Sequence, residues 1–231
     1  MTSIIIIIGG WDWRAQSLES VAQATSSMVS AMPDEPSGKW VTPRKEGDDY
    51  IYDSLDDASD ISDIATRIER TTSDAVGGRR PKPGFDIKLY LLDNAEEYAV
   101  ECRIRAGLEG PRGVRNHILV RLNFNTDDQL VVARAVKDHM AALVRAWHPD
   151  YLSAHTYEFR KAQGWDSTAN QIPVGWDTYL SDRTPLAHQM LVGSPITQTR
   201  QDDGVYFTLS GTPQDPSIDQ ARLLRKALGY E

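Results

Sequence analysis

The sequence predicts an α+β fold, with a largely antiparallel sheet flanked by helices in αβα-like layers. Strand-like segments occur in runs, helix-like segments separate the runs, and several strand segments alternate in polarity as half-buried hairpin strands do. The 231 residues are 40% apolar and 25% charged, which is typical of a globular protein. This length supports a sizeable core, so we expect a single domain over residues 1–231.

The first predicted element is a buried strand over residues 4–10, where five consecutive isoleucines precede two glycines. Ser17 suits the N-cap of a following helix, in which apolar residues recur close to helical spacing until Pro33 stops it. The next stretch, 33–49, is rich in Pro, Gly and charged residues. We therefore expect irregular structure there, apart from a short extended piece at 39–41.

The middle of the chain predicts a short helix and then a hairpin. Asp60 is placed to cap a helix over 61–68, where the isoleucines share one face. The basic loop 77–84 is rich in Gly and Pro and is not helical. Two strand segments follow at 86–91 and 98–105, and an Asp-Asn turn between them indicates a hairpin.

The second half of the chain predicts two further helices. A strand at 117–124 leads to Thr126-Asp127-Asp128-Gln129, which has the pattern of a capping box. The helix behind it has the clearest apolar stripe in the chain and stops at Pro149. Asp215-Pro216 opens a last helix, which Gly229 ends. Between these two helices, short strands are predicted at 154–159, 174–180, 189–198 and 204–210.

The apolar start of the chain lacks the organisation of a signal peptide, because the first basic residue, Arg14, follows the apolar run instead of preceding it. No apolar run approaches the ~20 residues that a membrane helix needs. Cys102 is the single cysteine, which excludes an intrachain disulfide and fits a reducing compartment. We expect a cytoplasmic protein that binds no membrane.

The negative charge is concentrated in one segment. The chain has 25 Lys and Arg against 33 Asp and Glu, so its net charge is −8, and this disfavours direct binding of nucleic acid. Residues 46–63 contain eight acids and no base, which leaves 25 acids against 25 bases elsewhere. Two interpretations stay open: a solvated loop and helix start, or a surface for a basic partner. The eight acids are Glu46, Asp48, Asp49, Asp53, Asp56, Asp57, Asp60 and Asp63.

Catalytic motifs are absent from the sequence. His148-Pro149-Asp150 matches the tripeptide of J-domain co-chaperones, but the preceding helix is not markedly basic and a strand-like stretch follows, which favours an ordinary helix C-terminus. The five histidines lack metal-ligand spacing, and the acidic segment lacks the EF-hand pattern. No nucleophile elbow or phosphate-binding loop is present. We expect no enzymatic activity, no metal and no cofactor.

Aromatic residues point towards binding instead. The chain has six Trp and nine Tyr, and Trp165 and Trp176 each follow a glycine in loop-like sequence. Such side chains are enriched at the centres of protein interfaces. The alternative for each one is a place at the margin of the core.

The stretch Gly175-Trp176-Asp177-Thr178-Tyr179-Leu180-Ser181, preceded by Ile172-Pro173-Val174, resembles the GW..YL segment of the bacterial immunity protein family numbered 52. The first strand running into Trp11-Asp12-Trp13-Arg14, and the strand 204–209 before the final helix, are similar to the layout of that family. Among such proteins, the chain looks most like the immunity protein of a type VI secretion effector whose toxin is a restriction-endonuclease-like DNase. The resemblance implies an α+β fold, no enzymatic activity and tight binding to one cognate toxin in the producing cell.

We therefore expect an immunity protein that neutralises a cognate antibacterial effector, a DNase, by covering its active site or by blocking its assembly. An acidic surface can occupy the positive surface that a nuclease presents to DNA, and it can speed association. The alternatives are a small hydrolase or transferase with an unrecognised site, and a secretion chaperone that binds the delivery region of the effector. The predicted partner-binding residues are Asp48, Asp49, Tyr50, Tyr52, Asp53, Asp56, Asp57, Asp60, Trp176 and Tyr179.

Overall fold

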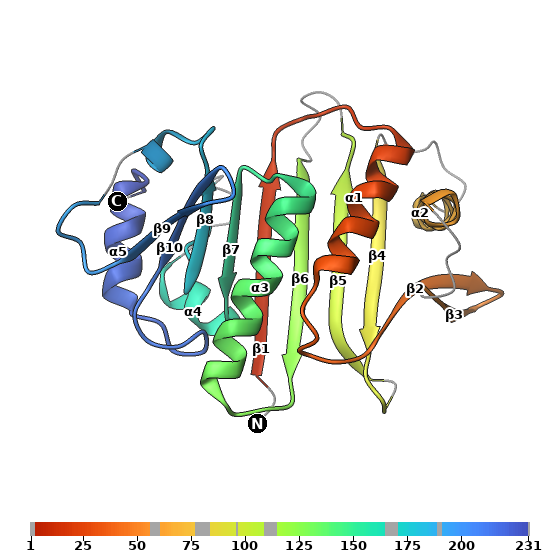
Figure 1. The fold of residues 1–231 in the computed structure, drawn as a ribbon, viewed down its shortest axis with the longest axis horizontal. Coiled ribbons are helices and arrows are strands. Elements are labelled where there is room, and N and C mark those ends of the chain that lie inside the picture. The colour runs from red at the N-terminus through yellow and green to blue at the C-terminus, as the bar shows by residue number, and fades with distance from the viewer. Residues whose placement is uncertain are drawn as a thin grey trace. The chain divides into compact units, whose positions relative to one another are not determined.

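The computed structural model has an α+β fold, in which the described residues form ten strands and five α-helices (Figure 1). The chain divides into two compact units, which we call the N-terminal unit (Gly10–Asn123) and the C-terminal unit (Met1–Gly9 with Phe124–Glu231). The predicted fold class is confirmed, whereas the single domain over residues 1–231 stays a prediction. The structure describes residues 3–55, 61–76, 84–95, 97–108, 115–164, 171–188 and 191–230.

In the N-terminal unit, five strands lie in the order β3-β2-β4-β5-β6. Helix α1 lies on one face of these strands, and α2 contacts α1, β4 and β2 (Figure 1). The strand pairs within this unit are antiparallel, as predicted. The elements are α1 (Leu18–Ala31), β2 (Lys39–Glu46), β3 (Asp49–Ser54), α2 (Ile61–Val76), β4 (Phe85–Leu92), β5 (Tyr98–Ala106) and β6 (Asn116–Phe124).

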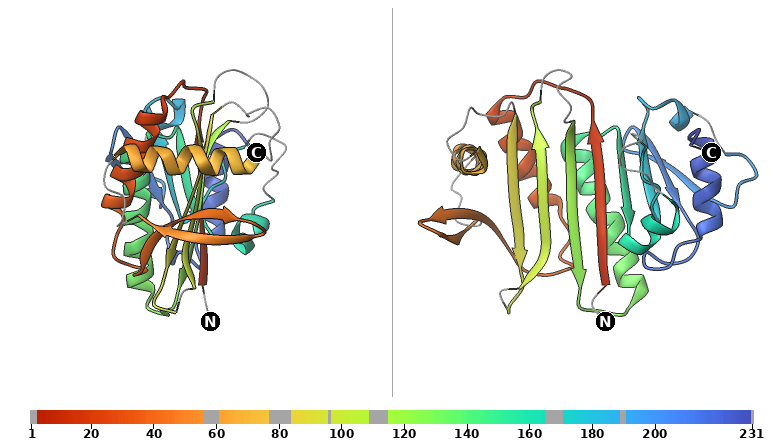
Figure 2. Two further views of the ribbon diagram at one scale, coloured as in Figure 1. Left: turned by 90° about the vertical axis from the view of Figure 1, so that its right-hand side faces the viewer. Right: turned by 180° about the vertical axis from the view of Figure 1, so that it is seen from behind.

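Alternation along the strands of this unit separates a buried face from an open one. Ile87 and Leu89 on β4 are 2% and 1% exposed, and Cys102 on β5 is fully buried. Lys88 and Arg103 face each other across the two strands and belong to the opposite face of the pleat. No described helix lies over that second face of β4, β5 and β6 (Figure 2, right).

In the C-terminal unit, the strand order is β1-β7-β8-β10-β9. Helix α3 covers one face of these strands, and α4 and α5 lie on the other (Figure 2). A core that includes Leu180, Phe207 and Leu224 fills the side of α4 and α5. The elements are β1 (Ser3–Trp11), α3 (Gln129–Trp147), β7 (Tyr151–His155), α4 (Tyr157–Ala162), β8 (Asp177–Ser181), a 3₁₀ turn η1 (Pro185–His188), β9 (Thr197–Gln201), β10 (Gly204–Thr208) and α5 (Ile218–Ala227).

Side-chain caps explain where several helices begin. Ser17 caps α1 as predicted, and its hydroxyl accepts a hydrogen bond from the backbone N–H of Ser20 at 3.1 Å. The predicted capping box at Thr126 is wrong, because α3 begins two residues later and Asp128 is its N-cap. The hydroxyl of Thr126 accepts the N–H of Asp128 in the turn before the helix instead. His148 ends α3 with a φ of 47°, which confirms the interpretation of His148 as a helix C-terminus.

Three other predicted elements have different bounds. The strand expected over 154–159 ends at His155, because Thr156 caps the short helix α4 through the N–H of Phe159 at 3.1 Å. The strand expected over 189–198 is β9, which begins only at Thr197. The helix expected over 61–68 continues to Val76, and Asp60 lies outside the described residues.

The stretch 33–49 is more regular than predicted, because β2 runs through Pro43 to Glu46. Pairing of β2 with β4 stops at Val41, so the missing N–H of Pro43 leaves no bond to β4 unmade. On its other side, Pro43 lies opposite Tyr52 of β3.

Among the described residues, no helix is both long and apolar enough to span a bilayer.

Candidate partner-binding site

The acidic segment of the sequence begins in a β-hairpin formed by β2 and β3 in the N-terminal unit. The paired residues run from Val41 opposite Ser54 to Glu46 opposite Asp49, so a two-residue turn joins the strands. Gly47 takes a φ of +64° in that turn, a conformation that suits glycine and allows a tight hairpin. Asp48 completes the turn. The hairpin therefore places several acids at its tip.

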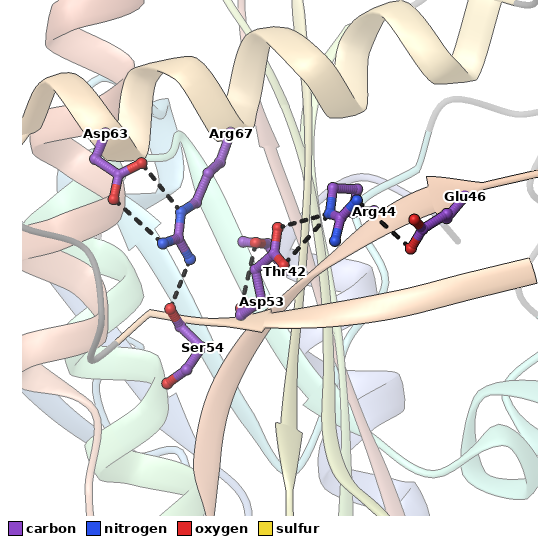
Figure 3. A network of polar contacts seen from close by, with 7 residues as sticks. All are labelled: Thr42, Arg44, Glu46, Asp53, Ser54, Asp63 and Arg67. Carbon is purple, nitrogen blue, oxygen red and sulfur yellow. Dashed lines mark hydrogen bonds and ion pairs between the residues drawn. The ribbon is translucent and has the colours of Figure 1, made fainter.

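One face of the hairpin is charged. Alternation along β3 puts Asp49, Ile51 and Asp53 on this face, opposite Glu46, Arg44 and Thr42 of β2. Arg44 forms ion pairs with Asp53 at 3.4 Å and with Glu46 at 3.7 Å (Figure 3). The charge of Asp53 is therefore compensated within the hairpin. Asp48 and Asp49, at the tip, have no ion-pair partner among the described residues, so their negative charge is uncompensated there.

A second arginine holds the other end of β3. Arg67 of α2 is 9% exposed, donates from Nη1 to the carbonyl oxygen of Ser54 at 2.6 Å, and pairs with Asp63 at 3.2 Å (Figure 3). The acid Asp63 is thus compensated on its own helix, one turn away from Arg67. This contact joins the end of the hairpin strand to α2.

The opposite face of the hairpin is aromatic. Tyr50 and Tyr52 alternate with the residues of the charged face, and these two tyrosines are 57% and 38% exposed. Tyr52 packs edge-on against Tyr90 with ring centroids 5.8 Å apart, and its hydroxyl is hydrogen-bonded to that of Tyr98. The rings of Tyr90 and Tyr98 are also in contact, with centroids 4.8 Å apart. Lys45 lies opposite Tyr50.

We call Tyr52, Tyr90 and Tyr98 the tyrosine cluster, and two of its members, Tyr52 and Tyr90, have a raised pKa. The hydrogen bond with Tyr98 raises the pKa of Tyr52 to about 12, and partial burial adds to this effect. Burial also raises the pKa of Tyr90. The cluster therefore offers amphipathic surface beside the negative tip of the hairpin.

Sequence reasoning missed two members of this cluster. Tyr90 and Tyr98 belong to the strands β4 and β5, which were expected as a hairpin without a role in binding. Their contact with Tyr52 depends on β2 lying between β3 and β4. The short extended piece expected at 39–41 did not suggest such a strand, so the contact of Tyr52 with Tyr90 and Tyr98 could not be predicted from the sequence.

Five of the ten predicted site residues are not part of the hairpin sequence. Asp56, Asp57 and Asp60 lie outside the described residues. Trp176 and Tyr179 belong to the C-terminal unit, where they are 5% and 2% exposed. Their role in partner binding stays a prediction.

Tyr179 makes contacts that explain its burial. Its hydroxyl donates to the carbonyl oxygen of Asp202 at 2.7 Å, and its ring packs against Tyr206 with centroids 4.9 Å apart. Asp202 also accepts from the hydroxyl of Tyr206 at 3.1 Å. These contacts hold β8 against the turn between β9 and β10.

Four of the five histidines, His139, His148, His155 and His188, belong to the C-terminal unit. In the C-terminal unit, Nδ1 of His155 is 3.3 Å from Oγ of Ser153, but both residues are fully buried. Burial lowers the pKa of His155 to about 3 and that of His139 to about 4, so both rings are neutral at physiological pH. No group of three or more His, Cys, Asp or Glu side chains suited to a metal ion occurs among the described residues.

No family model and no curated protein matches the chain. Among solved structures, the chain is similar to a protein of Pseudomonas aeruginosa described as a T6SS protein, that is, a protein of the type VI secretion system. The similarity has a TM-score of 0.58 and 15% sequence identity, and it covers 99% of this chain and 76% of the other. At this identity the likeness concerns the fold.

Proposed function

We propose that this chain is an immunity protein, which binds and neutralises a cognate antibacterial effector of the type VI secretion system in the cytoplasm of the producing cell. We further propose that the effector is a DNase. The observation that carries the proposal is the hairpin of β2 and β3, which presents uncompensated acids and exposed tyrosines together. The likeness in fold to a T6SS protein of P. aeruginosa supports the secretion context.

The charge of the hairpin suits a nuclease as partner. A DNase must offer a positive surface to the phosphates of DNA, and Asp48 and Asp49 can approach that surface from the tip of the hairpin. Opposite charges of this kind mainly raise the rate of association, and salt screens the effect. The two acids therefore provide recognition at a distance.

The tyrosines of the hairpin suit the contact itself. Tyr50 and Tyr52 expose rings beside the acids. Tyr is enriched among the residues that dominate binding energy, because a rigid ring buries much area with little loss of conformational freedom. We expect the tyrosines to set the lifetime of the complex, whereas the acids set the rate at which it forms.

The first test is co-purification of this chain with the toxin encoded in the neighbouring reading frame. A complex that survives at micromolar concentration and abolishes DNA cleavage is the expected result. Absence of a complex at that concentration contradicts the proposal. A complex that forms only with the delivery region of the effector, and not with its isolated toxic domain, identifies a secretion chaperone instead.

The second test removes charge at the tip. The double variant Asp48→Asn, Asp49→Asn should slow association by about 10-fold at low salt and flatten its salt dependence, because the steering charge is gone. Stopped-flow mixing at several salt concentrations measures this.

The matched control for the tip variant is Glu158→Gln with Asp219→Asn, which removes two exposed acids from the C-terminal unit. Its net charge changes by the same amount. If the control slows association as much as the tip variant does, the hairpin has no special role and the assignment of the site fails.

A further inference from the structure

The outer edge of β3 can be located from one hydrogen bond. In an antiparallel pair, the N–H and C=O of a residue point to the same side, and successive residues alternate sides. The N–H of Leu55 donates to the carbonyl oxygen of Trp40 at 2.8 Å, directly after β3, so residue 55 points towards β2. Asp53, Ile51 and Asp49 share that direction. Tyr50, Tyr52 and Ser54 therefore direct their backbone groups away from β2.

Two independent contacts agree with this direction. The carbonyl oxygen of Ser54 accepts from Arg67 of α2, which is possible because it points away from β2. Pro43 has no N–H to give and lies opposite Tyr52, where an antiparallel pair makes no hydrogen bond between the strands. The outer edge of β3 is thus closed by α2 at Ser54 and open at Tyr50 and Tyr52.

No described residue covers the open part of this edge. The backbone groups of Tyr50 and Tyr52 have no hydrogen-bond partner in the part of the chain that the structure describes. Exposed edges are usually blunted by proline, lysine or a bulge, because an unpaired strand attracts other strands. The six residues of β3, Asp49–Ser54, contain no proline or lysine, and their register with β2 is continuous.

We propose that β3 binds its partner by strand addition. An extended segment of the partner pairs with the backbone of Tyr50 and Tyr52 and continues the sheet of the N-terminal unit at β3. On one side of that segment, alternate residues are Lys or Arg and approach the charged face at Asp49. On the other side, alternate residues are apolar or aromatic and pack on Tyr50 and Tyr52.

Charge and polarity on the edge specify this occupant. Side chains of an added strand stand beside those of its neighbour and on the same face, so acids on β3 favour bases on the partner, and tyrosines favour apolar side chains. Asp53 is already paired with Arg44, so the basic preference is greatest at Asp49. The identity of the partner as an effector rests on the proposed function, whereas the mode of binding rests on the geometry of β3.

Hydrogen exchange in the full chain tests the backbone pairing directly. The probe is a blocked peptide of alternating Lys and Val, added in excess to the ¹⁵N-labelled protein. Exchange of the Tyr50 and Tyr52 amides should slow by about 10-fold or more, because these amides become hydrogen-bonded. The amides of Ile51 and Asp53 already face β2 and serve as internal controls, with little change expected.

Matched peptides separate pairing from simple charge attraction. A peptide of the same composition with all Lys residues grouped together keeps its charge but loses the alternation. A Lys-Val peptide methylated at the nitrogen of every Val keeps the side chains but cannot donate from the edge that faces β3 when Val packs on Tyr50 and Tyr52 in an antiparallel pair. Both should protect Tyr50 and Tyr52 much less than the alternating peptide. Equal protection by all three peptides, or no protection by any, overturns strand addition.

A pair of variants tests the same edge with the effector. Tyr50→Ala removes the side chain and keeps the outward N–H, whereas Tyr50→Pro removes both and leaves the bonds to β2 in place. We expect the proline variant to bind at least about 10-fold more weakly than the alanine variant, with unchanged exchange at Ile51 showing that the hairpin is intact. Equal affinities overturn strand addition and leave the proposed function standing. If the unaltered chain binds no effector, the proposed function fails, and the peptide experiment still decides the mode of binding.

Discussion

Asp177 is a buried carboxyl group whose titration affects stability. It lies at the start of β8, is 1% exposed, and accepts a hydrogen bond from Oγ1 of Thr208 at 2.6 Å. Burial raises its pKa from 3.8 to about 6, against the opposing effects of the Thr208 bond and the charge of Lys137. The folded protein therefore holds this proton more tightly than the unfolded chain does.

Replacing Asp177 tests this effect. Both states are protonated well below pH 4, and the folded state loses stability as the pH rises from about 4 to 6, by ~3 kcal/mol in all. The variant Asp177→Asn keeps an acceptor for Thr208 and has no charge to bury. We expect it to be more stable than the parent by about 1–3 kcal/mol at pH 7.5 and similar at pH 4.

Urea unfolding at both pH values measures the difference. The exposed acid Asp219 provides the control, since Asp219→Asn should show no pH-dependent change of this size. A variant of Asp177 that is less stable than the parent at pH 7.5 would show that the carboxylate is stabilised in the folded state.

At the scale of elements, the segment that carries the GW..YL resemblance is part of the packed interior. A side chain at Gly175 would meet the carbonyl oxygen of Ala154 and Oγ of Ser153 on the adjacent strand β7. Trp176, Tyr179 and Leu180 are buried. Close approach of β7 and this segment therefore explains the glycine, and packing explains the three residues that follow the pattern.

Substitution of Gly175 should destabilise the C-terminal unit. Gly175→Ala forces backbone shifts in a well-packed region, with an expected loss of about 1–3 kcal/mol. Gly47→Ala is a useful comparison, because no atom lies within 4 Å of its added methyl group and only the φ of +64° opposes it, at about 1 kcal/mol. Chemical denaturation of the two variants measures the difference, and an equal or larger loss at Gly47 contradicts the packing argument.

The sequence predicted elements well where a local signal was sufficient. Ser17 and the five isoleucines define α1 and β1 through capping and burial, and both elements form where expected. Prediction failed where residues far apart in the sequence determine the local structure. Pro43 predicts a break in the strand. Strand β2 nevertheless continues, because neither β3 nor β4 needs a backbone N–H at position 43. A six-residue helix such as α4 contains too few turns for its periodicity to differ from that of a strand.

The candidate site shows the same division. Composition located the acids, and the tyrosines Tyr50 and Tyr52 among them indicated a surface that is both acidic and aromatic. The compensation of Asp53 by Arg44 and of Asp63 by Arg67 depends on the register of the hairpin and on the placement of α2. Counting charges therefore overestimated the negative surface that the described residues present, because two of their acids, Asp53 and Asp63, are compensated.

At the scale of the whole molecule, the single cysteine reports on opening of the N-terminal unit. Cys102 is fully buried on β5, and burial raises its thiol pKa to about 12, so thiolate is scarce at pH 8. We expect a thiol reagent to react at least about 1,000-fold more slowly with the folded protein than with the chain in urea, because reaction requires opening of the core. Absorbance of the released product follows the reaction, and rapid reaction of the folded protein contradicts this burial.

The open edge of β3 also bears on how this protein behaves in crowded solution. An edge that accepts a foreign strand is in principle open to the same edge of a second copy, which is how many sheet proteins polymerise. Two copies of β3 brought together would place acid beside acid, with Asp48 and Asp49 of each tip adding to the repulsion. The negative charge thus keeps identical molecules apart, and it leaves the edge available to a strand of opposite charge.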